Sequence, residues 1–384
     1  MNKNQHIPQG YKSSPLGIIP EDWEVKRLGE ICTHFKSGNT ITSKEIFDKG
    51  LYPVYGGNGF RGFSNTFTHD GNFILIGRQG ALCGNINYVE GKNYISEHAI
   101  AVQTNENMQW LKYKLINWNL NRFSESSAQP GLSVEKLVRY KLVIPTSSEQ
   151  NKIAEILQLW DTAISKQTQL VEKLTLRKRG LMQQLLTGKK RLKGFEGKWK
   201  EVRLGEIFDE RNESNRGDLP LLSITGDRGV IYQSESDKRD TSNDDKSKYK
   251  RICPNDIGYN TMRMWQGRSA LSELEGIVSP AYTIVTPKET VDVRFMAMLI
   301  QQPKIVYAFW THSQGLVSDT LNCKYPDFCQ VKVTIPSKKE QTAIAELFYK
   351  IDKGIELAKQ KLSSLQEQKK GLMQVLLTGK KRIK

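Results

Sequence analysis

Residues 180–191 read GLMQQLLTGKKR, and residues 371–382 read GLMQVLLTGKKR. The two stretches belong to a longer duplication, in which about half of the positions in residues 141–193 recur in residues 332–384. Internal similarity of this kind arises when one structural unit is used twice. The chain of 384 residues therefore contains two copies of one scaffold element.

A second repeated element has the pattern Trp-x-x-x-Arg-Leu-Gly-Glu-Ile, which begins at Trp23 and again at Trp199. The copies are 176 residues apart here and 191 apart in the longer duplication, so the segments between them differ in length. Residues 38–131 and 214–315 also show no convincing match to each other. The pattern predicts two different recognition modules on one repeated scaffold.

Each copy of the longer duplication predicts a helix with a heptad seam. Residues 149–186 contain no proline and one glycine, and seam positions recur at alternating spacings of four and three. The helix should start after Pro145, where Ser148 is available as the N-cap, and end at Gly188. The second copy keeps the same register after Pro336. The seam residues are Ile153, Leu157, Trp160, Ile164, Val171, Leu174, Leu181, Leu185, Ile344, Phe348, Ile351, Ile355, Leu362, Leu365, Leu372 and Leu376.

These helices should pair with each other. A helix of about 37 residues is about 55 Å long, and a seam two or three residues in seven wide is typical of a coiled coil. The modules between the helices favour an antiparallel pair, although each helix could instead pack on its own module. The predicted fold class is α+β, with two mixed α/β modules joined by two long helices that form an antiparallel coiled coil.

The organisation predicts four regions. They are a first module at residues 1–148, a central long helix at 149–193, a second module at 194–339 and a C-terminal long helix at 340–384. Within the modules, runs such as Asn72–Ile76 and Tyr282–Val285 predict strands, and Trp110–Trp118 and Val293–Ile300 predict helices. The net charge of +16 points to a polyanion, but the two helical regions hold +6 and +5 of it.

Two basic turns carry side chains suited to base recognition. Arg78 and Gln79 follow a predicted strand, and Arg263 and Gln266 interleave with Trp265 in the second module. Arginine can pair with guanine and glutamine with adenine. The alternative is that the arginines are surface or ion-paired residues and Trp265 is a core residue. The candidate DNA-binding residues are Asn58, Arg61, Arg78, Gln79, Arg228, Asn260, Arg263, Trp265, Gln266 and Arg268.

Two other segments allow more than one interpretation. Gly57–Gly62 matches the G-x-G-x-x-G pattern of dinucleotide-binding loops, but those loops precede a helix and Phe63–Phe67 looks extended. We interpret it as a turn that comes close to another backbone. Asp237–Arg251 alternates acidic and basic residues, which is typical of a solvated loop; the alternative is a flexible arm that touches phosphates.

The sequence predicts no catalytic or metal site. It contains no G-x-S-x-G, P-loop or H-E-x-x-H motif, and its five histidines lack ligand spacing. The five cysteines form no C-x-x-C pair, which argues against a zinc site or disulfide framework and favours a reducing cytoplasm. No apolar run approaches the 18 residues of a membrane span. These absences favour a binding protein.

The repeated motifs resemble the specificity subunit of type I restriction–modification systems. The resemblance rests on GLMQxLLTGKKR, on Ile-Pro-x-x-x-Glu-Gln before each long helix and on the Trp23 and Trp199 elements, and it covers essentially the whole chain. The loops at Tyr52–Gly59 and Asn260–Gly267 are also similar to loops of that family's target recognition domains. Ser147-Ser148 and Lys338-Lys339 depart from the Pro-Leu often seen before Glu-Gln.

The resemblance implies a non-catalytic subunit in which two target recognition domains each read half of a bipartite, asymmetric site in double-stranded DNA. It implies that the paired helices set the spacer and hold two modification subunits, which methylate adenine with S-adenosylmethionine. Two restriction subunits, which use ATP and magnesium, can join such a complex. No cofactor or metal is expected on this chain itself.

Two rival functions remain open. The first is an enzyme, a nuclease or methyltransferase in its own right, which predicts that the purified chain acts on DNA alone. The second is a coiled-coil adaptor with two protein-binding modules, which predicts no salt-dependent affinity for DNA.

Overall fold

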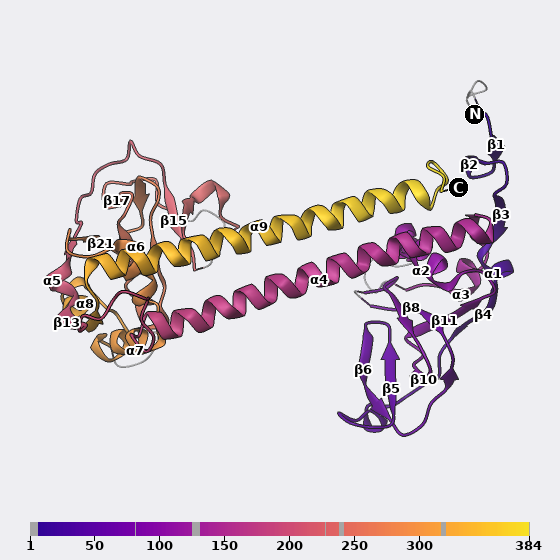
Figure 1. Ribbon diagram of the computed structural model, residues 1–384, viewed down its shortest axis with the longest axis horizontal. Helices are drawn as coiled ribbons and strands as arrows, with labels where there is room; N and C mark the ends of the chain where they lie inside the picture. The colour runs from indigo at the N-terminus through magenta and orange to yellow at the C-terminus, as the bar shows by residue number, and fades with distance from the viewer. Residues whose placement is uncertain are drawn as a thin grey trace. The chain divides into compact units, whose positions relative to one another are not determined.

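The computed structural model describes residues 7–80, 82–124, 131–226, 228–237, 242–315 and 320–383 (Figure 1). The chain divides into two compact units. Unit 1 consists of Met1–Gln169 and Lys359–Lys384, and unit 2 of Leu170–Ala358. Within the described ranges, no helix is both long and apolar enough to cross a membrane.

Unit 1 is built around two four-stranded sheets. The first has the order β4 (Cys32–Ser37), β11 (Ala99–Thr104), β8 (Phe73–Gly77), β9 (Ile86–Val89). The second has the order β6 (Gly59–Ser64), β5 (Tyr52–Gly56), β10 (Lys92–Ile95), β7 (His69–Asp70). Two-stranded sheets are formed by β1 (Tyr11–Ser14) with β2 (Gly17–Pro20) and by β3 (Glu24–Arg27) with β12 (Lys141–Ile144). The short helices are α1 (Leu28–Ile31), η1 (Ser43–Glu45), α2 (Met108–Trp118), η2 (Leu120–Phe123) and α3 (Val134–Leu137).

Strand β8 is apolar throughout because both of its faces are buried. Its side chains alternate between two faces of the sheet. Ile74 and Ile76 belong to the large core that includes helix α2, and Phe73 and Leu75 belong to a second core on the other face. Because both faces are covered, all of β8 is buried. The strand predicted at Asn72–Ile76 is thereby confirmed.

Unit 2 has one four-stranded sheet and three strand pairs. The sheet has the order β14 (Phe208–Glu210), β21 (Tyr282–Pro287), β18 (Ile257–Asn260), β19 (Ser269–Leu271). The pairs are β13 (Lys200–Arg203) with β22 (Lys332–Ile335), β15 (Leu222–Ile224) with β16 (Val230–Tyr232), and β17 (Lys250–Ile252) with β20 (Gly276–Val278). The short helices are α5 (Leu204–Ile207), η3 (Gln233–Glu235), η4 (Met264–Gln266), α6 (Val293–Leu299), α7 (Pro303–His312) and α8 (Tyr325–Gln330). The predicted strand at Tyr282–Val285 and helices at Trp110–Trp118 and Val293–Ile300 are confirmed as β21, α2 and α6.

The two long helices are α4 (Ser147–Leu185) and α9 (Lys338–Leu376), and each contributes one half to each unit (Figure 1). In unit 1 the Lys369 Nζ lies 2.5 Å from Asp161 Oδ1, and in unit 2 the Lys178 Nζ lies 2.5 Å from Asp352 Oδ1. The start of one helix therefore lies beside the end of the other in both units. This is the antiparallel coiled coil of the predicted fold class, and its two seam lysines are each paired with an aspartate of the other helix.

The helix seams and caps follow the sequence closely. Every predicted seam residue is buried or half-buried. Gly188 and Gly379, which follow the helices, have φ values of +71° and +73°, so the expected left-handed ends are confirmed. The N-cap prediction was wrong, because α4 already begins at Ser147 and Ser148 lies in its first turn. The Thr146 hydroxyl instead accepts a hydrogen bond from the Glu149 amide at 3.4 Å.

The Glu-Gln pair that begins each long helix has a structural purpose in both copies. The Gln150 side-chain oxygen accepts a hydrogen bond from the Asn107 amide, and that of Gln341 accepts one from the Asp292 amide, both at 2.9 Å. Asn107 and Asp292 are the N-caps of α2 and α6. Both glutamines are 1% exposed. Each therefore fastens a long helix to the helix that covers the adjacent sheet.

The glutamate of the pair forms what we call the latch, made of Glu149, Arg382 and Trp23 in unit 1 and of Glu340, Arg191 and Trp199 in unit 2. Each arginine follows the C-terminal glycine of one long helix and forms two parallel hydrogen bonds with the glutamate that starts the other. The arginine also lies over the tryptophan ring, 5.9 Å from it in unit 1 and 5.8 Å in unit 2. The latch explains why LLTGKKR and the tryptophan element are repeated together.

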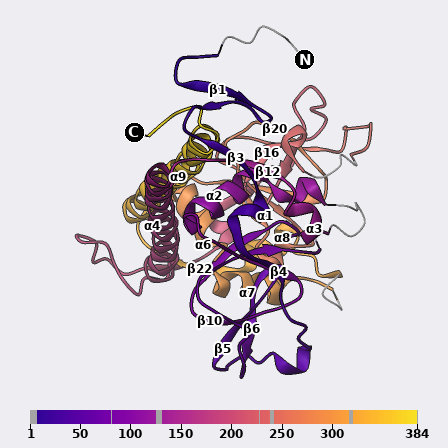
Figure 2. The ribbon, with the colours of Figure 1, turned by 90° about the vertical axis from the view of Figure 1, so that its right-hand side faces the viewer.

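Unit 1 also contains the β1–β2 hairpin, which precedes the first repeated tryptophan element. It lies beside the C-terminal end of the chain, which Figure 2 shows clearly. The Tyr11 hydroxyl donates to the Gly379 carbonyl at 3.0 Å. The hairpin therefore covers the end of α9 within this unit.

Candidate DNA interface

The glycine-rich segment of unit 1 is a tight turn between β5 and β6. A Cβ at Gly57 would lie 2.7 Å from the His98 carbonyl oxygen, and one at Gly77 would lie 2.5 Å from the Gly57 carbonyl oxygen. The turn is followed by a strand and not by a helix. The interpretation as a close approach of two backbones is confirmed, and the segment lacks the helix that a dinucleotide loop requires.

This close approach brings the four unit 1 candidates together. Asn58 lies in the turn, Arg61 lies on β6, and Arg78 and Gln79 follow β8. The Gln79 carbonyl oxygen is 3.5 Å from a Cβ at Gly57. Asn58, Arg61 and Gln79 are exposed and Arg78 is half-buried. The candidates therefore lie on two adjacent turns and on the strand β6 that follows the first of them.

The Arg78 turn is held by its backbone. The Arg78 amide donates to the His98 carbonyl at 2.8 Å, and the Arg78 carbonyl accepts from the Leu132 amide at 2.9 Å. No hydrogen bond or ion pair of the guanidinium is present within the described residues. A backbone held by hydrogen bonds, with a guanidinium that has no partner among the described residues, is the arrangement expected of a residue that binds a ligand.

Two residues beside these turns, Asn87 and Phe60, were not predicted as candidates for DNA binding. A Cβ at Gly59 would lie 3.6 Å from Asn87 Oδ1, and the buried Asn87 Nδ2 has no hydrogen-bond partner in the described part of the chain. Phe60 is 56% exposed, and its ring is edge-on to those of Tyr55 and Phe63. Neither residue belongs to a sequence pattern that could have distinguished it from an ordinary strand residue.

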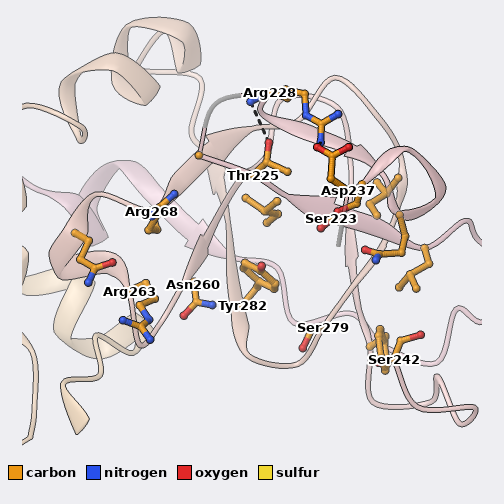
Figure 3. A pocket seen from close by; sticks show the side chains of 18 residues that line it. Ser223, Thr225, Arg228, Asp237, Ser242, Asn260, Arg263, Arg268, Ser279 and Tyr282 are labelled. Carbon is orange, nitrogen blue, oxygen red and sulfur yellow. Dashed lines mark hydrogen bonds and ion pairs between the residues drawn. The ribbon is translucent and has the colours of Figure 1, made fainter. Parts of the chain in front are cut away.

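Five of the six candidates in unit 2 line one pocket of about 740 Å³ between the β15–β16 hairpin and the η4 turn. Figure 3 shows Arg263, Asn260 and Arg268 at one end of this pocket and Arg228 with Asp237 at the other. Gln266 is the fifth candidate that lines the pocket. Residues that the sequence did not suggest also line it, among them Ser223, Thr225, Ser242, Ser279 and Tyr282.

Trp265 is placed differently from the other candidates. It is half-buried and does not line the pocket, and its indole nitrogen donates to the Met262 carbonyl at 3.0 Å. The hydrogen bond closes the η4 turn on itself. Trp265 therefore supports the turn that carries Arg263 and Gln266, and its predicted contact with DNA stays a prediction.

The three pocket arginines differ in their partners. Arg228 is paired with Asp237 at 2.9 Å and donates to the Glu235 carbonyl at 3.1 Å. Within the described residues, the Arg263 and Arg268 guanidinium groups have no ion pair or hydrogen bond. A Cβ at Gly226 would overlap the Arg268 Nη1, so Arg268 reaches across to the turn between β15 and β16.

Polar groups deeper in the pocket are already engaged. The Asn260 side-chain oxygen accepts a hydrogen bond from the Met262 amide at 3.0 Å. Burial raises the pKa of Tyr282, although its hydrogen bond with the Asn260 side chain acts in the opposite direction. Both groups are neutral at pH 7, so the positive charge of the pocket comes from the arginines.

The charged segment Asp237–Arg251 is partly structured. Residues 238–241 lie outside the described residues. At its other end Lys250 and Arg251 begin strand β17, and Arg251 forms ion pairs with Glu213 at 2.9 Å and Glu275 at 2.5 Å. These cations are engaged within the unit, which argues against an arm that touches phosphates at this end. In the described ranges no group of three or more His, Cys, Asp or Glu side chains could hold a metal.

Residues 20–175 and 196–367 match the type I restriction modification DNA specificity domain. The chain belongs to this family. Its predicted assignment as a specificity subunit is confirmed, and catalysis belongs to other subunits. The rival assignment as an enzyme in its own right is therefore wrong.

Several specificity subunits are similar to this one. The EcoprrI type I restriction enzyme specificity subunit of Escherichia coli is 40% identical over 179 residues, and the match spans 44% of each chain. A putative MjaX specificity subunit of Methanocaldococcus jannaschii is 25% identical over 98% of this chain and 97% of its own length. A solved type I S subunit from M. genitalium has a TM-score of 0.59 over 92% of this chain and 96% of its own, at 15% identity. That likeness supports the fold.

Proposed function

We propose that this specificity subunit reads a bipartite, asymmetric site in double-stranded DNA, with unit 1 contacting one half-site and unit 2 the other. The observation that carries the proposal is the contrast between the latch, whose glutamate–arginine pair occurs in both units, and the candidate DNA-binding surfaces, which share neither sequence nor shape. A duplicated scaffold that carried two equal surfaces would suit a symmetric site. Two unlike surfaces suit an asymmetric one.

The paired helices set the length of the unspecified spacer. Each has 39 residues and is about 58 Å long at 1.5 Å per residue. Half-sites that are read from one side of a duplex lie about one helical turn apart, roughly 34 Å. Helices of this length are sufficient for that separation.

The helices also provide the surface on which two modification subunits dock. Leu159, Leu176 and Leu357 are 69%, 69% and 65% exposed on α4 and α9, although leucine gains nothing from contact with water. The modification subunits methylate adenine with S-adenosylmethionine. Two restriction subunits that use ATP and magnesium complete the assembly, and this chain binds no cofactor itself.

The test of this function is the pattern of methylated adenines in the genome. We expect one bipartite motif with two different halves, which disappears when the gene for this chain is deleted and returns when it is supplied again. Unchanged methylation after deletion would contradict the proposal. Binding to DNA that does not weaken with added salt, in the complex with modification subunits, would instead favour the adaptor.

The role of the helices is tested by shortening both at once. Asp161 faces Lys369 and Lys178 faces Asp352, so deleting residues 166–172 together with residues 358–364 removes one heptad from each helix and keeps the facing pairs. The deletion removes about 10 Å of helix, and we expect a shorter spacer with both half-sites unchanged. The control deletes only residues 166–172, which puts the facing pairs out of register. An unchanged spacer in the double deletion would contradict the role of the helices.

A further inference from the structure

We propose that the unit 2 pocket holds the sugar–phosphate backbone of the DNA through Arg263 and Arg268, and that these arginines do not read base edges. The inference rests on the proposed function, in which unit 2 contacts DNA. It replaces the expectation from sequence that both basic turns read bases.

The shape of the surface is the first reason. Base edges lie on the floor of a groove, where they are reached by protruding elements such as a helix or a two-stranded ribbon. Arg263 and Arg268 instead line a hollow of about 740 Å³, together with the β15–β16 hairpin. The phosphates form the outer ridge of the duplex, and a hollow is the shape that receives a ridge.

The chemistry of the lining is the second reason. Phosphate oxygens only accept hydrogen bonds, and a guanidinium only donates them. Among the described lining residues Asp237 is the one acidic side chain, and it is paired with Arg228. Arg263 and Arg268 are exposed and have no acidic partner among the described residues. The hydroxyls of Ser223 and Ser279 add further groups that can donate to a phosphate.

The state of the neighbouring side chains is the third reason. An amide reads adenine by donating and accepting at the same time. The Asn260 oxygen already accepts from the Met262 amide, and the Trp265 indole is turned toward the Met262 carbonyl. Two of the side chains that could have read bases are thus used to build the turn. Besides the exposed Gln266 amide, the turn offers the ligand the positive charge of Arg263 and Arg268.

The test compares Arg263→Ala and Arg268→Ala in the full chain, assembled with its modification subunits, by measuring affinity for duplexes that vary in the unit 2 half-site. We expect each variant to lose about tenfold in affinity for every sequence alike, with the same preferred site as the parent. The slope of log affinity against log salt should fall by about one for each lost phosphate contact. Arg263→Lys should recover most of the affinity, because a phosphate accepts a point charge.

The matched control is Arg216→Ala, which removes the same charge from unit 2 at an arginine that is paired with Asp218 at 2.8 Å and does not line the pocket. It should leave the salt slope unchanged. A second probe is a duplex with a neutral methylphosphonate at single linkages. One linkage should weaken binding of the parent by about tenfold and have no further effect on Arg263→Ala.

The outcomes separate this inference from the proposed function. A changed base preference at one position, with the salt slope and the methylphosphonate effect unaltered, would overturn the phosphate assignment and leave DNA recognition intact. A parent assembly whose affinity for DNA shows no dependence on salt or sequence would overturn the proposed function and this inference together.

Discussion

Unit 1 and unit 2 contain the same latch, but they use its tryptophan differently. In unit 1 the Trp23 indole donates to Glu149 at 2.8 Å, and Glu149 also accepts from Arg382 and from the Ile383 amide. In unit 2 the Trp199 indole nitrogen has no partner among the described residues. The duplication therefore preserved the ion pair, while among the described residues the indole and backbone amide hydrogen bonds to the glutamate occur in unit 1 alone.

The candidate DNA-binding surfaces differ far more than the latches. Unit 1 presents its candidates on two adjacent turns and on strand β6, and unit 2 presents a hollow lined by arginines. The glutamates of the latch and the glutamines beside them are buried, and a buried polar group is costly to leave without its partner. Exposed turn residues carry no such penalty. Buried hydrogen bonds thus keep the scaffold constant, while the exposed surfaces are free to diverge.

The largest effect should come from breaking the latch. Glu149→Gln leaves the Arg382 guanidinium, which is 18% exposed, without its main carboxylate, and we expect a loss of about 3 kcal/mol in the free energy of unfolding. Hydrogen exchange should rise in unit 1 near the ends of α4 and α9. The matched variant Glu340→Gln should raise exchange in unit 2 instead. Equal changes in both units from either variant would contradict two separate latches.

The contribution of Glu149 should depend on pH. Burial by itself would raise the pKa of Glu149, but hydrogen bonds from Arg382, Trp23 and the Ile383 amide outweigh burial and lower it. A carboxyl group with a lowered pKa in the folded state stabilises the fold above its unfolded pKa, near 4.3, and loses that contribution as pH falls through the folded value. The difference in unfolding free energy between the parent and Glu149→Gln should thus be constant near pH 7 and shrink below about pH 4. A difference that grows on acidification would refute this account.

The next effect concerns the unlike surfaces. Arg78→Ala should change the base preference at one position of the unit 1 half-site, with about 2 kcal/mol of discrimination lost, because the half-buried Arg78 has a guanidinium without a partner among the described residues. Methylome sequencing of the variant would show the relaxed position. The unit 2 half-site should be unchanged. Relaxation of both half-sites would argue against separate recognition by the two units.

The smallest effect should come from the tryptophans. Trp23→Phe removes the indole hydrogen bond to Glu149 and should cost about 1–2 kcal/mol of unfolding free energy. Trp199→Phe removes an indole nitrogen without a partner in the described residues and should cost less than Trp23→Phe. Thermal unfolding of the two variants measures both. Equal losses would mean that the asymmetry of the latch has no energetic consequence.

The elements that sequence predicted well are those fixed by local pattern. Local sequence encodes the long helices, their glycine ends and strands such as β8. Each of them follows from hydrophobic periodicity or from turn residues next to it in the chain. The N-terminal hairpin was not predicted, because it is stabilised by the distant end of α9 through Tyr11 and Gly379. The Ser148 cap failed for a different reason, since any of several neighbouring polar residues after Pro145 could have begun the helix.

The sequence by itself determined that a duplicated scaffold carries two unlike modules, because a repeat and a heptad seam are properties of residue order. It also placed this chain among the DNA specificity subunits through motifs that recur in both halves. The tertiary structure alone decided which candidates lie together and what shape they form. The Gly57 and Gly77 backbones come into contact from separate strands, and Arg228, Arg263 and Arg268 line one pocket. The shape of each surface depends on contacts between residues far apart in the chain. No local sequence pattern encodes such contacts.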